Sequence, residues 1–432
     1  MKRKFSLLIC LLWLVASLGP IGAGQTAYAD VAENSGSEEV QSFPVLMQGE
    51  RQNDHPFVLV HGFSGWGREE MFGYKYWGGF DDIESSLRQE GYQTYTASVG
   101  PISSNWDRAC ELYAQIKGGV VDYGAVHSQQ HGHERYGKSY PGLYPQWGEV
   151  NENNGQQNRI HLIAHSQGGQ TARVLIELLS QGSAAERDQT PASELSPLFQ
   201  GNGKGMVHSV LTISTPHDGT SLTELVEGII PYSQQILGLA AAATGISEID
   251  VYDFKLDHWG LKRQPGESFS SYKERVYNSP IWQTSKDTAQ WDLSPAGAQE
   301  LNGWVRAQPE VYYFSVSTEQ TYRSALTDYE VPELWMNPLF SMTSLFLGSY
   351  TNDEFIDSQW WQNDGVVNTI SMDGPERGST DLIVPYDGTP NRGEWNDLGL
   401  MDSYDHGDII GHGSRDMQDW YTEAARLLAS LP

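Results

Sequence analysis

Residues 159–175 read Arg-Ile-His-Leu-Ile-Ala-His-Ser-Gln-Gly-Gly-Gln-Thr-Ala-Arg-Val-Leu, with a serine at position 166. The apolar run 160–164 predicts a buried strand, and the leucine and alanine spacing over 172–179 predicts a helix after it. Glycines 168 and 169 permit a tight turn between the two elements. Such a turn exposes the serine hydroxyl at a helix N-terminus. The segment therefore predicts a nucleophilic Ser166, and an ordinary glycine-rich loop is the less favoured alternative.

A strand, a serine turn and a helix in this order are typical of the α/β-hydrolase fold, whose usual motif is Gly-x-Ser-x-Gly. Here Ala164 replaces the first glycine. We therefore predict an α/β protein with a mostly parallel central sheet flanked by helices. Residues 54–432 contain no repeat or linker, and we expect one domain with insertions at about 105–150 and 221–300.

The remaining catalytic groups should follow the serine in the order acid, then histidine, because that is the order of this fold. The candidate acids are Asp353, Asp357, Asp364 and Asp387, and the candidate bases are His406 and His412. The base must accept the serine proton, and the acid must orient the imidazole. The pattern of residues alone leaves both choices open.

Backbone N–H groups that could bind an oxyanion are also visible in the sequence. Residues 56–60 form a short β-like run, which His-Gly interrupts at positions 61 and 62. In this fold one N–H comes from the residue after the nucleophile, here Gln167, and the other from the loop after an early strand, here Phe63. The alternative is a plain glycine turn after a strand.

The N-terminus has the pattern of a signal peptide. Three basic residues at 2–4 precede an apolar stretch, and Ala-Tyr-Ala ends at position 29. We predict cleavage after residue 29, secretion, a flexible extension over 30–53 and no stable membrane anchor. Of the two cysteines, only Cys110 lies outside this leader, so we expect no internal disulfide.

The charge balance restricts the partners. The chain has 55 acidic residues against 27 basic ones, a formal net charge of −28. Nucleic acids and anionic membranes attract basic surfaces, so this balance argues against both. An uncharged ester is compatible with it.

Two further segments are informative. Residues 222–246 contain two apolar helical patterns separated by Pro231, and these either pack on the core or cover a site. His127, His131 and His133 form a cluster suited to zinc, which raises the alternative of a zinc hydrolase. A binding module that uses the many tryptophans is the weakest hypothesis.

Taken together, these motifs resemble the secreted thermoalkalophilic lipases of the Bacillus and Geobacillus type. The segments that carry the resemblance are 57–77, 103–108, 121–142, the serine turn with its alanine, 215–219, 251–268 and 363–368. The resemblance implies an esterase that acts on triacylglycerols at an oil–water interface, with Ser166, Asp364 and His406 as its triad. It also implies that residues 222–246 form a lid, whereas a lidless carboxylesterase or polyesterase is the alternative.

The same resemblance implies two structural metals. Its zinc ligands match Asp107, His127, His133 and Asp287, which leaves His131 as a loop histidine. Four protein ligands leave no open position, so this zinc would stabilise the fold rather than catalyse. A calcium ion would be held by Asp408 and the carbonyl of Trp335, although residues 411–414 form a shorter loop than the family has.

Overall fold

The central feature of the fold is a parallel β-sheet. The computed structural model describes residues 50–225, 252–352 and 354–432, which all belong to one unit of the chain, Gln41–Pro432. The strands of the sheet are β1 (Phe57–Val60), β2 (Thr94–Ala97), β5 (Ile160–His165), β6 (Val207–Ile213), β7 (Tyr312–Glu319), β10 (Ile383–Pro385) and β11 (Trp395–Asp402). Their order is β10-β11-β7-β6-β5-β1-β2, and every neighbouring pair is parallel. The predicted α/β fold with a parallel sheet is confirmed.

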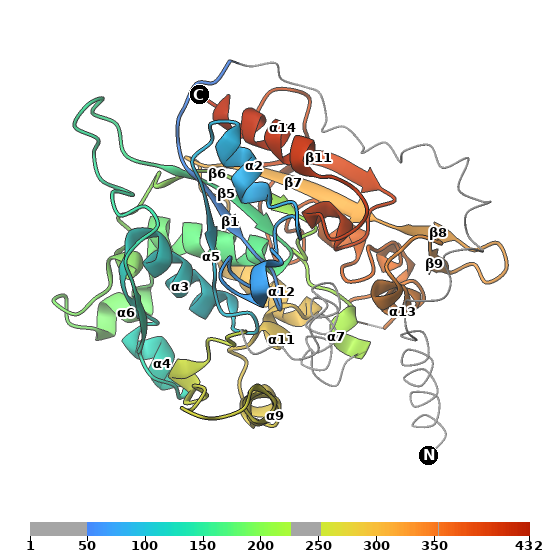
Figure 1. The fold of residues 1–432 in the computed structure, drawn as a ribbon, viewed down its shortest axis with the longest axis horizontal. Coiled ribbons are helices and arrows are strands. Elements are labelled where there is room, and N and C mark those ends of the chain that lie inside the picture. Colours follow the sequence, from blue (N-terminus) through green and yellow to red (C-terminus); the bar gives the residue numbers. More distant parts are fainter. Residues whose placement is uncertain (1–49, 226–251, 353) are drawn as a thin grey trace. The chain divides into compact units, whose positions relative to one another are not determined.

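Helices surround the sheet and two small hairpins lie outside it (Figure 1). The helices are α2 (Ile83–Gln89), α3 (Asn105–Lys117), α4 (Ala125–His131), α5 (Gln167–Gln181), α6 (Ala184–Gln189), α7 (Leu222–Leu225), α9 (Phe269–Tyr277), α10 (Ile281–Thr284), α11 (Ala289–Asp292), α12 (Pro295–Trp304), α13 (Pro338–Leu347) and α14 (Gln418–Ala429). The antiparallel hairpins are β3 (Gly119–Asp122) with β4 (Tyr136–Tyr140), and β8 (Thr321–Arg323) with β9 (Glu330–Pro332). Short 3-10 helices include η4 (Asp257–Trp259), η5 (Ser358–Trp360), η6 (Thr369–Ser371) and η7 (Asp408–Ile410).

Both faces of the sheet are covered. Every residue of β1, β5 and β6 is buried, as expected for parallel strands between two helical layers. The chain moves in one direction across the sheet from β1 to β2, and in the opposite direction from β2 to β5 and β6. Right-handed crossovers therefore place α2 on one face and α3 and α5 on the other. Helix α14 packs against α2, and α3 packs against α5 (Figure 1).

The reversal of strand order creates the place for a site. Strands β1 and β5 are neighbours, but their connections leave in opposite directions, so the carboxyl ends of these strands border a crevice. Ser166 directly follows β5, and the loop that begins at His61 follows β1. Sheet topology thus brings the two predicted parts of the catalytic site to one edge.

The predicted insertions are only partly described. Residues 105–150 contain α3, α4 and the β3–β4 hairpin. Of the expected lid at 222–246, only α7 lies within the described residues, and 226–251 lie outside them, as do the signal peptide and most of the N-terminal extension. Within the described ranges, no helix is both long enough and apolar enough to cross a bilayer.

Candidate active site and metal cluster

Ser166 lies in a strained turn between β5 and α5. Its φ of 57° and ψ of −133° are conformations that non-glycine residues rarely adopt. The turn is held by a hydrogen bond from its N–H to the carbonyl of Ile213 (2.9 Å) and by one from the Thr215 hydroxyl to its carbonyl (3.0 Å). A Cβ at Gly168 would lie 2.3 Å from the carbonyl oxygen of Val60, so this position requires glycine. The elbow predicted from the sequence is therefore present.

A histidine–aspartate pair lies at the same edge of the sheet. His406 Nδ1 is 2.7 Å from Asp364 Oδ2 in a buried hydrogen bond. The Asp364 carboxylate also accepts the Thr318 hydroxyl (2.9 Å) and the N–H groups of Val366 (3.0 Å) and Val367 (2.8 Å). These donors stabilise a negative charge on a fully buried side chain and fix its orientation. The carboxylate is thus placed to orient His406.

The pair lies beside the elbow. The rings of His406 and His165, the residue before Ser166, have centroids 4.5 Å apart. By contrast, His412 Nε2 donates to the carbonyl of Lys75 (3.1 Å), and burial lowers the pKa of His412 to about 4. The structure therefore joins His406, and not His412, to a carboxylate near the serine.

The other candidate aspartates within the described residues make hydrogen bonds to the backbone of their own loops. Asp357 accepts the N–H of Gln359 (2.9 Å), and the exposed Asp387 accepts that of Thr389 (2.9 Å). Asp353 lies outside the described residues. Of the candidate acids within the described ranges, Asp364 is the one that contacts a candidate histidine.

The loop after β1 lies directly against Ser166. A Cβ added to Gly62 would be 2.5 Å from the Cβ of Ser166, so only glycine permits this approach. Gly62 N–H donates to the Tyr76 hydroxyl (3.0 Å), which holds the loop in place. Across the described part of the chain, no acceptor pairs with the backbone N–H of Phe63 or of Gln167. Both donors are available for a ligand.

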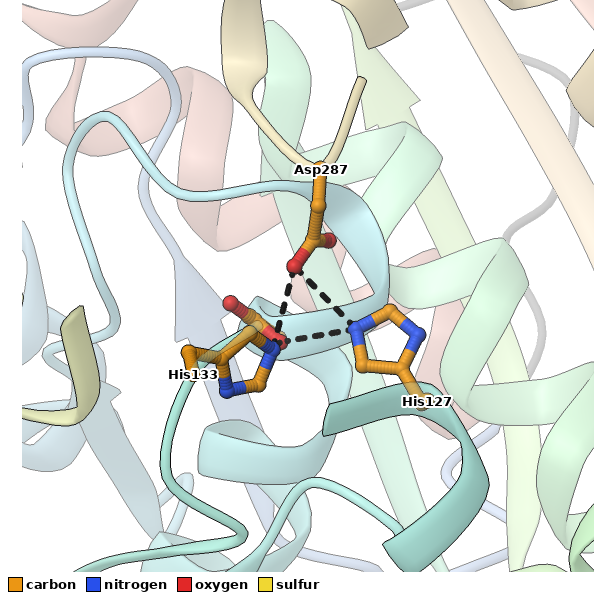
Figure 2. Close-up of side chains that lie close together, drawn as sticks. His127, His133 and Asp287 are labelled. Atoms are coloured by element: carbon orange, nitrogen blue, oxygen red, sulfur yellow. Dashed lines mark hydrogen bonds and ion pairs between the residues drawn. The ribbon is translucent and has the colours of Figure 1, made fainter. Parts of the chain in front are cut away.

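A second cluster brings together Asp107, His127, His133 and Asp287. One ligand atom from each lies within 4.8 Å of all the others. Figure 2 shows the His127 and His133 rings and the Asp287 carboxylate converging on a common point, with both Nε2 atoms 3.2 Å from Asp287 Oδ2. The four residues come from α3, from α4 and the loop after it, and from the segment before α11. The predicted ligand set is therefore assembled as a possible metal-binding group.

The chemistry of this group suits a cation. Asp107 Oδ1 and His133 Nε2 are buried and lack hydrogen-bond partners, which is costly unless a ligand compensates. Although burial opposes it, the adjacent carboxylates of Asp107 and Asp287 raise the pKa of His127 to about 10. Two imidazole nitrogens and two carboxylates are a donor set typical of zinc. His131 is not part of the group, as expected, but it is the last residue of α4 and not a loop histidine as predicted.

The family is decided by the match of residues 53–431 to the model described as "Lipase-like, C-terminal domain". The chain belongs to this lipase family. It is 38% identical over 400 residues to "Lipase 1" of Staphylococcus aureus (strain MRSA252), which covers 89% of this chain and 55% of that protein. The chain thus spans about half the length of the curated relatives it matches. The lipase family predicted from the motifs is confirmed, but not the Bacillus and Geobacillus type in particular.

Solved structures of the family agree with the fold. Lipase 1 from Pelosinus fermentans is 51% identical with a TM-score of 0.82, covering 88% of this chain and 100% of that one. EstA from Clostridium botulinum is 48% identical with a TM-score of 0.83, covering 89% of each chain. These similarities support the α/β-hydrolase architecture inferred from the elbow.

The sequence analysis did not identify two buried residues that organise these sites. The first is Arg108 on α3, which donates to the carbonyl of His61, to the carbonyl of Gly100 (2.7 Å) and to the Thr171 hydroxyl (2.8 Å). It thereby connects the loop after β1 with α5. Burial lowers the pKa of Arg108 to about 10, which still leaves it charged at neutral pH. A single arginine in a helical pattern is usually exposed, so nothing in the sequence indicated that Arg108 is buried.

The second is His258 on η4. Its Nε2 lies 2.8 Å from Asp107 Oδ2, and its ring stacks on Tyr123 with centroids 4.3 Å apart. The contact holds one carboxylate oxygen of Asp107 while the other faces the cluster. Because His258 lies far along the chain from the three clustered histidines, no spacing rule could associate it with them.

The predicted calcium residues lie in two segments that Asp405 connects, the turn around Trp335 and the start of η7. Asp405 Oδ2 accepts the N–H of Asn337 (2.9 Å), two residues after Trp335, and its Oδ1 accepts the N–H of Asp408 (2.9 Å). Asp405 thus bridges the two segments through hydrogen bonds to the backbone. Calcium binding at Asp408 and Trp335 stays a prediction.

Proposed function

We propose that this protein is a secreted triacylglycerol lipase whose catalytic residues are Ser166, His406 and Asp364. The observation that carries the proposal is the 2.7 Å hydrogen bond between His406 and Asp364 beside the strained serine turn. Membership of the lipase family supports the same reading. Ser166 and the loop after β1 border the topological switch point of the sheet, which supports a role for them in acyl transfer.

These positions support a serine esterase reaction. The Ser166 hydroxyl attacks the ester carbonyl while His406 Nε2 takes its proton, and Asp364 stabilises the resulting imidazolium. The N–H groups of Phe63 and Gln167 donate to the tetrahedral oxyanion. His406 then returns the proton to the leaving alcohol, which leaves an acyl-serine. Water attacks this ester by the same proton route and releases the fatty acid and the free serine.

The substrate is proposed to be an uncharged lipid at an oil–water interface. The net charge of −28 disfavours anionic substrates, and triacylglycerols carry no charge. We infer that residues 222–246 act as a lid, as in the lipases of the Bacillus and Geobacillus type that the motifs resemble. Secretion follows from the N-terminal leader, residues 1–29, with residues 30–53 as an extension before the single catalytic domain.

We propose that Asp107, His127, His133 and Asp287 hold a structural zinc. When bound, the ion supplies a positive charge that neutralises two buried carboxylates and joins α3, α4 and the segment before α11. It takes no part in the steps at Ser166. We propose a second structural ion, calcium, at Asp408 and the carbonyl of Trp335.

A serine-directed phosphonate tests the class of enzyme. We expect stoichiometric labelling of Ser166, detected by peptide mass spectrometry, and loss of ester hydrolysis in proportion to the label. A metal chelator applied at low temperature should leave the initial rate unchanged. The opposite pattern, in which the phosphonate has no effect and the chelator abolishes the rate at once, would establish a zinc hydrolase.

A lid predicts that the rate depends on the physical state of the substrate. Opening it exposes apolar side chains, which is unfavourable in water and favourable at an oil surface. We expect the specific rate on a triacylglycerol to rise by about tenfold as its concentration passes the solubility limit. Equal rates on both sides of that limit, measured by titration of released acid, would indicate a lidless esterase.

A further inference from the structure

Helix α13 exposes part of its apolar side chains to solvent. Met342 and Leu345, one helical turn apart, are 47% and 52% exposed, whereas Thr343 and Ser344 between them are buried. A surface helix normally directs its apolar side chains toward the core, as α13 does with Phe340, so exposed apolar residues on its other side are unusual. Packing among the residues that the structure describes does not account for the exposed side of α13.

The buried side of α13 is occupied by the loop of the proposed catalytic acid. The Thr343 hydroxyl donates to the carbonyl of Gly365, the residue after Asp364. Ser344 accepts a hydrogen bond at its carbonyl from the Asn363 side chain (3.4 Å). Because these contacts hold the Thr343 side of the helix inward, the exposed apolar residues lie on the other side. The orientation of the helix is therefore fixed relative to the catalytic loop.

The apolar surface continues into the loop before the helix. Leu334 is 85% exposed and Trp335 is 76% exposed. We call Leu334, Trp335, Met342 and Leu345 the α13 surface. Residues 334–352 contain no aspartate, glutamate, lysine, arginine or histidine, in a chain of which 19% is charged. Helix α13 packs against β9 and against α7, where the described residues end before the proposed lid (Figure 1).

The α13 surface also adjoins the active site. Phe340, on the inner side of the helix, lies with its ring centroid 6.4 Å from that of His406 in an edge-on contact. Phe340 belongs to a buried apolar cluster that also includes Leu222 of α7 and packs against Phe63. A structure bound to the outer side of α13 would therefore lie one helix away from the catalytic histidine.

We propose that the α13 surface docks the protein onto a neutral lipid surface. The inference rests on the proposed lipase function and specifies its partner surface. Aliphatic and tryptophan side chains in a segment that contains no charged residue partition favourably into an uncharged oil phase. The strongly acidic remainder of the chain is repelled by an anionic bilayer, so the complementary surface is uncharged. This surface belongs to described residues outside the proposed lid and is exposed in this structure.

Droplet binding of the Ser166→Ala protein tests the proposal without consuming the substrate. Leu345→Glu should reduce the fraction bound to triolein droplets coated with phosphatidylcholine by about tenfold, and Met342→Gln should reduce it in the same direction to a smaller extent. The matched control is Val150→Glu. Val150 is 67% exposed, so this variant also replaces an exposed apolar side chain by a carboxylate. It precedes β5 in the chain, whereas Ser166 follows that strand. Addition of anionic phosphatidylglycerol to the droplets should weaken binding of the parent protein.

Two further measurements separate the possible failures. In the wild-type background, Leu345→Glu should leave hydrolysis of a monomeric short-chain ester within about twofold, because α13 contacts the catalytic loop only through its inner side. Equal droplet binding by the parent, Leu345→Glu and Val150→Glu proteins would overturn the docking proposal. The proposal would also be overturned if sedimentation detected a dimer in the absence of lipid, and if Leu345→Glu dissociated this dimer without changing droplet binding. No ester hydrolysis by the wild type would instead refute the proposed function.

Discussion

Replacement of Ser166 by alanine is expected to reduce kcat on a monomeric ester by roughly 10⁴-fold or more, with little change in the thermal midpoint. The physical reason is that the acyl-enzyme cannot form without the hydroxyl, and the oxyanion donors alone give only weak catalysis. Alanine has a similar size and the hydrogen bonds that hold this turn are made by the backbone N–H and carbonyl of Ser166. His406→Ala should show a loss of similar size. Initial rates and circular dichroism melting curves supply the two readouts.

His412 provides a matched control for the histidine. Its ring is buried and donates to the carbonyl of Lys75, a bond that a glutamine amide can also make. We therefore expect His412→Gln to keep activity within a few-fold of the wild type while His406→Gln loses it. If His412→Gln is inactive and His406→Gln active, with both proteins folded, the assignment of the base is reversed.

Removal of the metal is expected to lower the thermal midpoint by about 10 °C or more. Without a cation, the carboxylates of Asp107 and Asp287 lie buried near each other, and Asp107 Oδ1 and His133 Nε2 have no hydrogen-bond partner. Elemental analysis of the purified protein should find a single zinc per chain. Dialysis against a chelator should remove it, and added zinc should restore the midpoint measured by calorimetry.

A pair of aspartate variants tests the location of this effect. Asp287→Asn should lose zinc and melt at a lower temperature. Asp387→Asn, which changes an exposed turn, should keep its zinc and the wild-type melting temperature. Because four protein ligands leave no open coordination position, the metal-free protein should still react with a phosphonate below its melting temperature. A zinc-free preparation whose midpoint does not respond to chelation would contradict the structural-zinc proposal.

Local sequence patterns were sufficient to predict the fold. The serine turn, the apolar strand before it and the helix after it are specified by residues within about twenty positions, because hydrophobic periodicity and glycine requirements are local properties. The parallel sheet followed from the strand–helix alternation that such a turn implies. The ligand set Asp107, His127, His133 and Asp287 came from family resemblance rather than from spacing.

Contacts between distant residues depend on the tertiary structure. The order of residues in the sequence left His406 and His412 as alternatives, and only the family resemblance favoured His406. The fold joins His406 to Asp364 across 42 positions of the chain. It likewise joins His258 to Asp107 across 151 positions. The exposed apolar side of α13 shows the same limit. The sequence does not indicate that the loop of Asp364 packs against Thr343 and Ser344, which leaves the exposed leucine and methionine of the helix on the other side. The sequence by itself determined which local elements form, because local energies depend on neighbouring residues. Which side chains meet depends on how the sheet and its insertions pack.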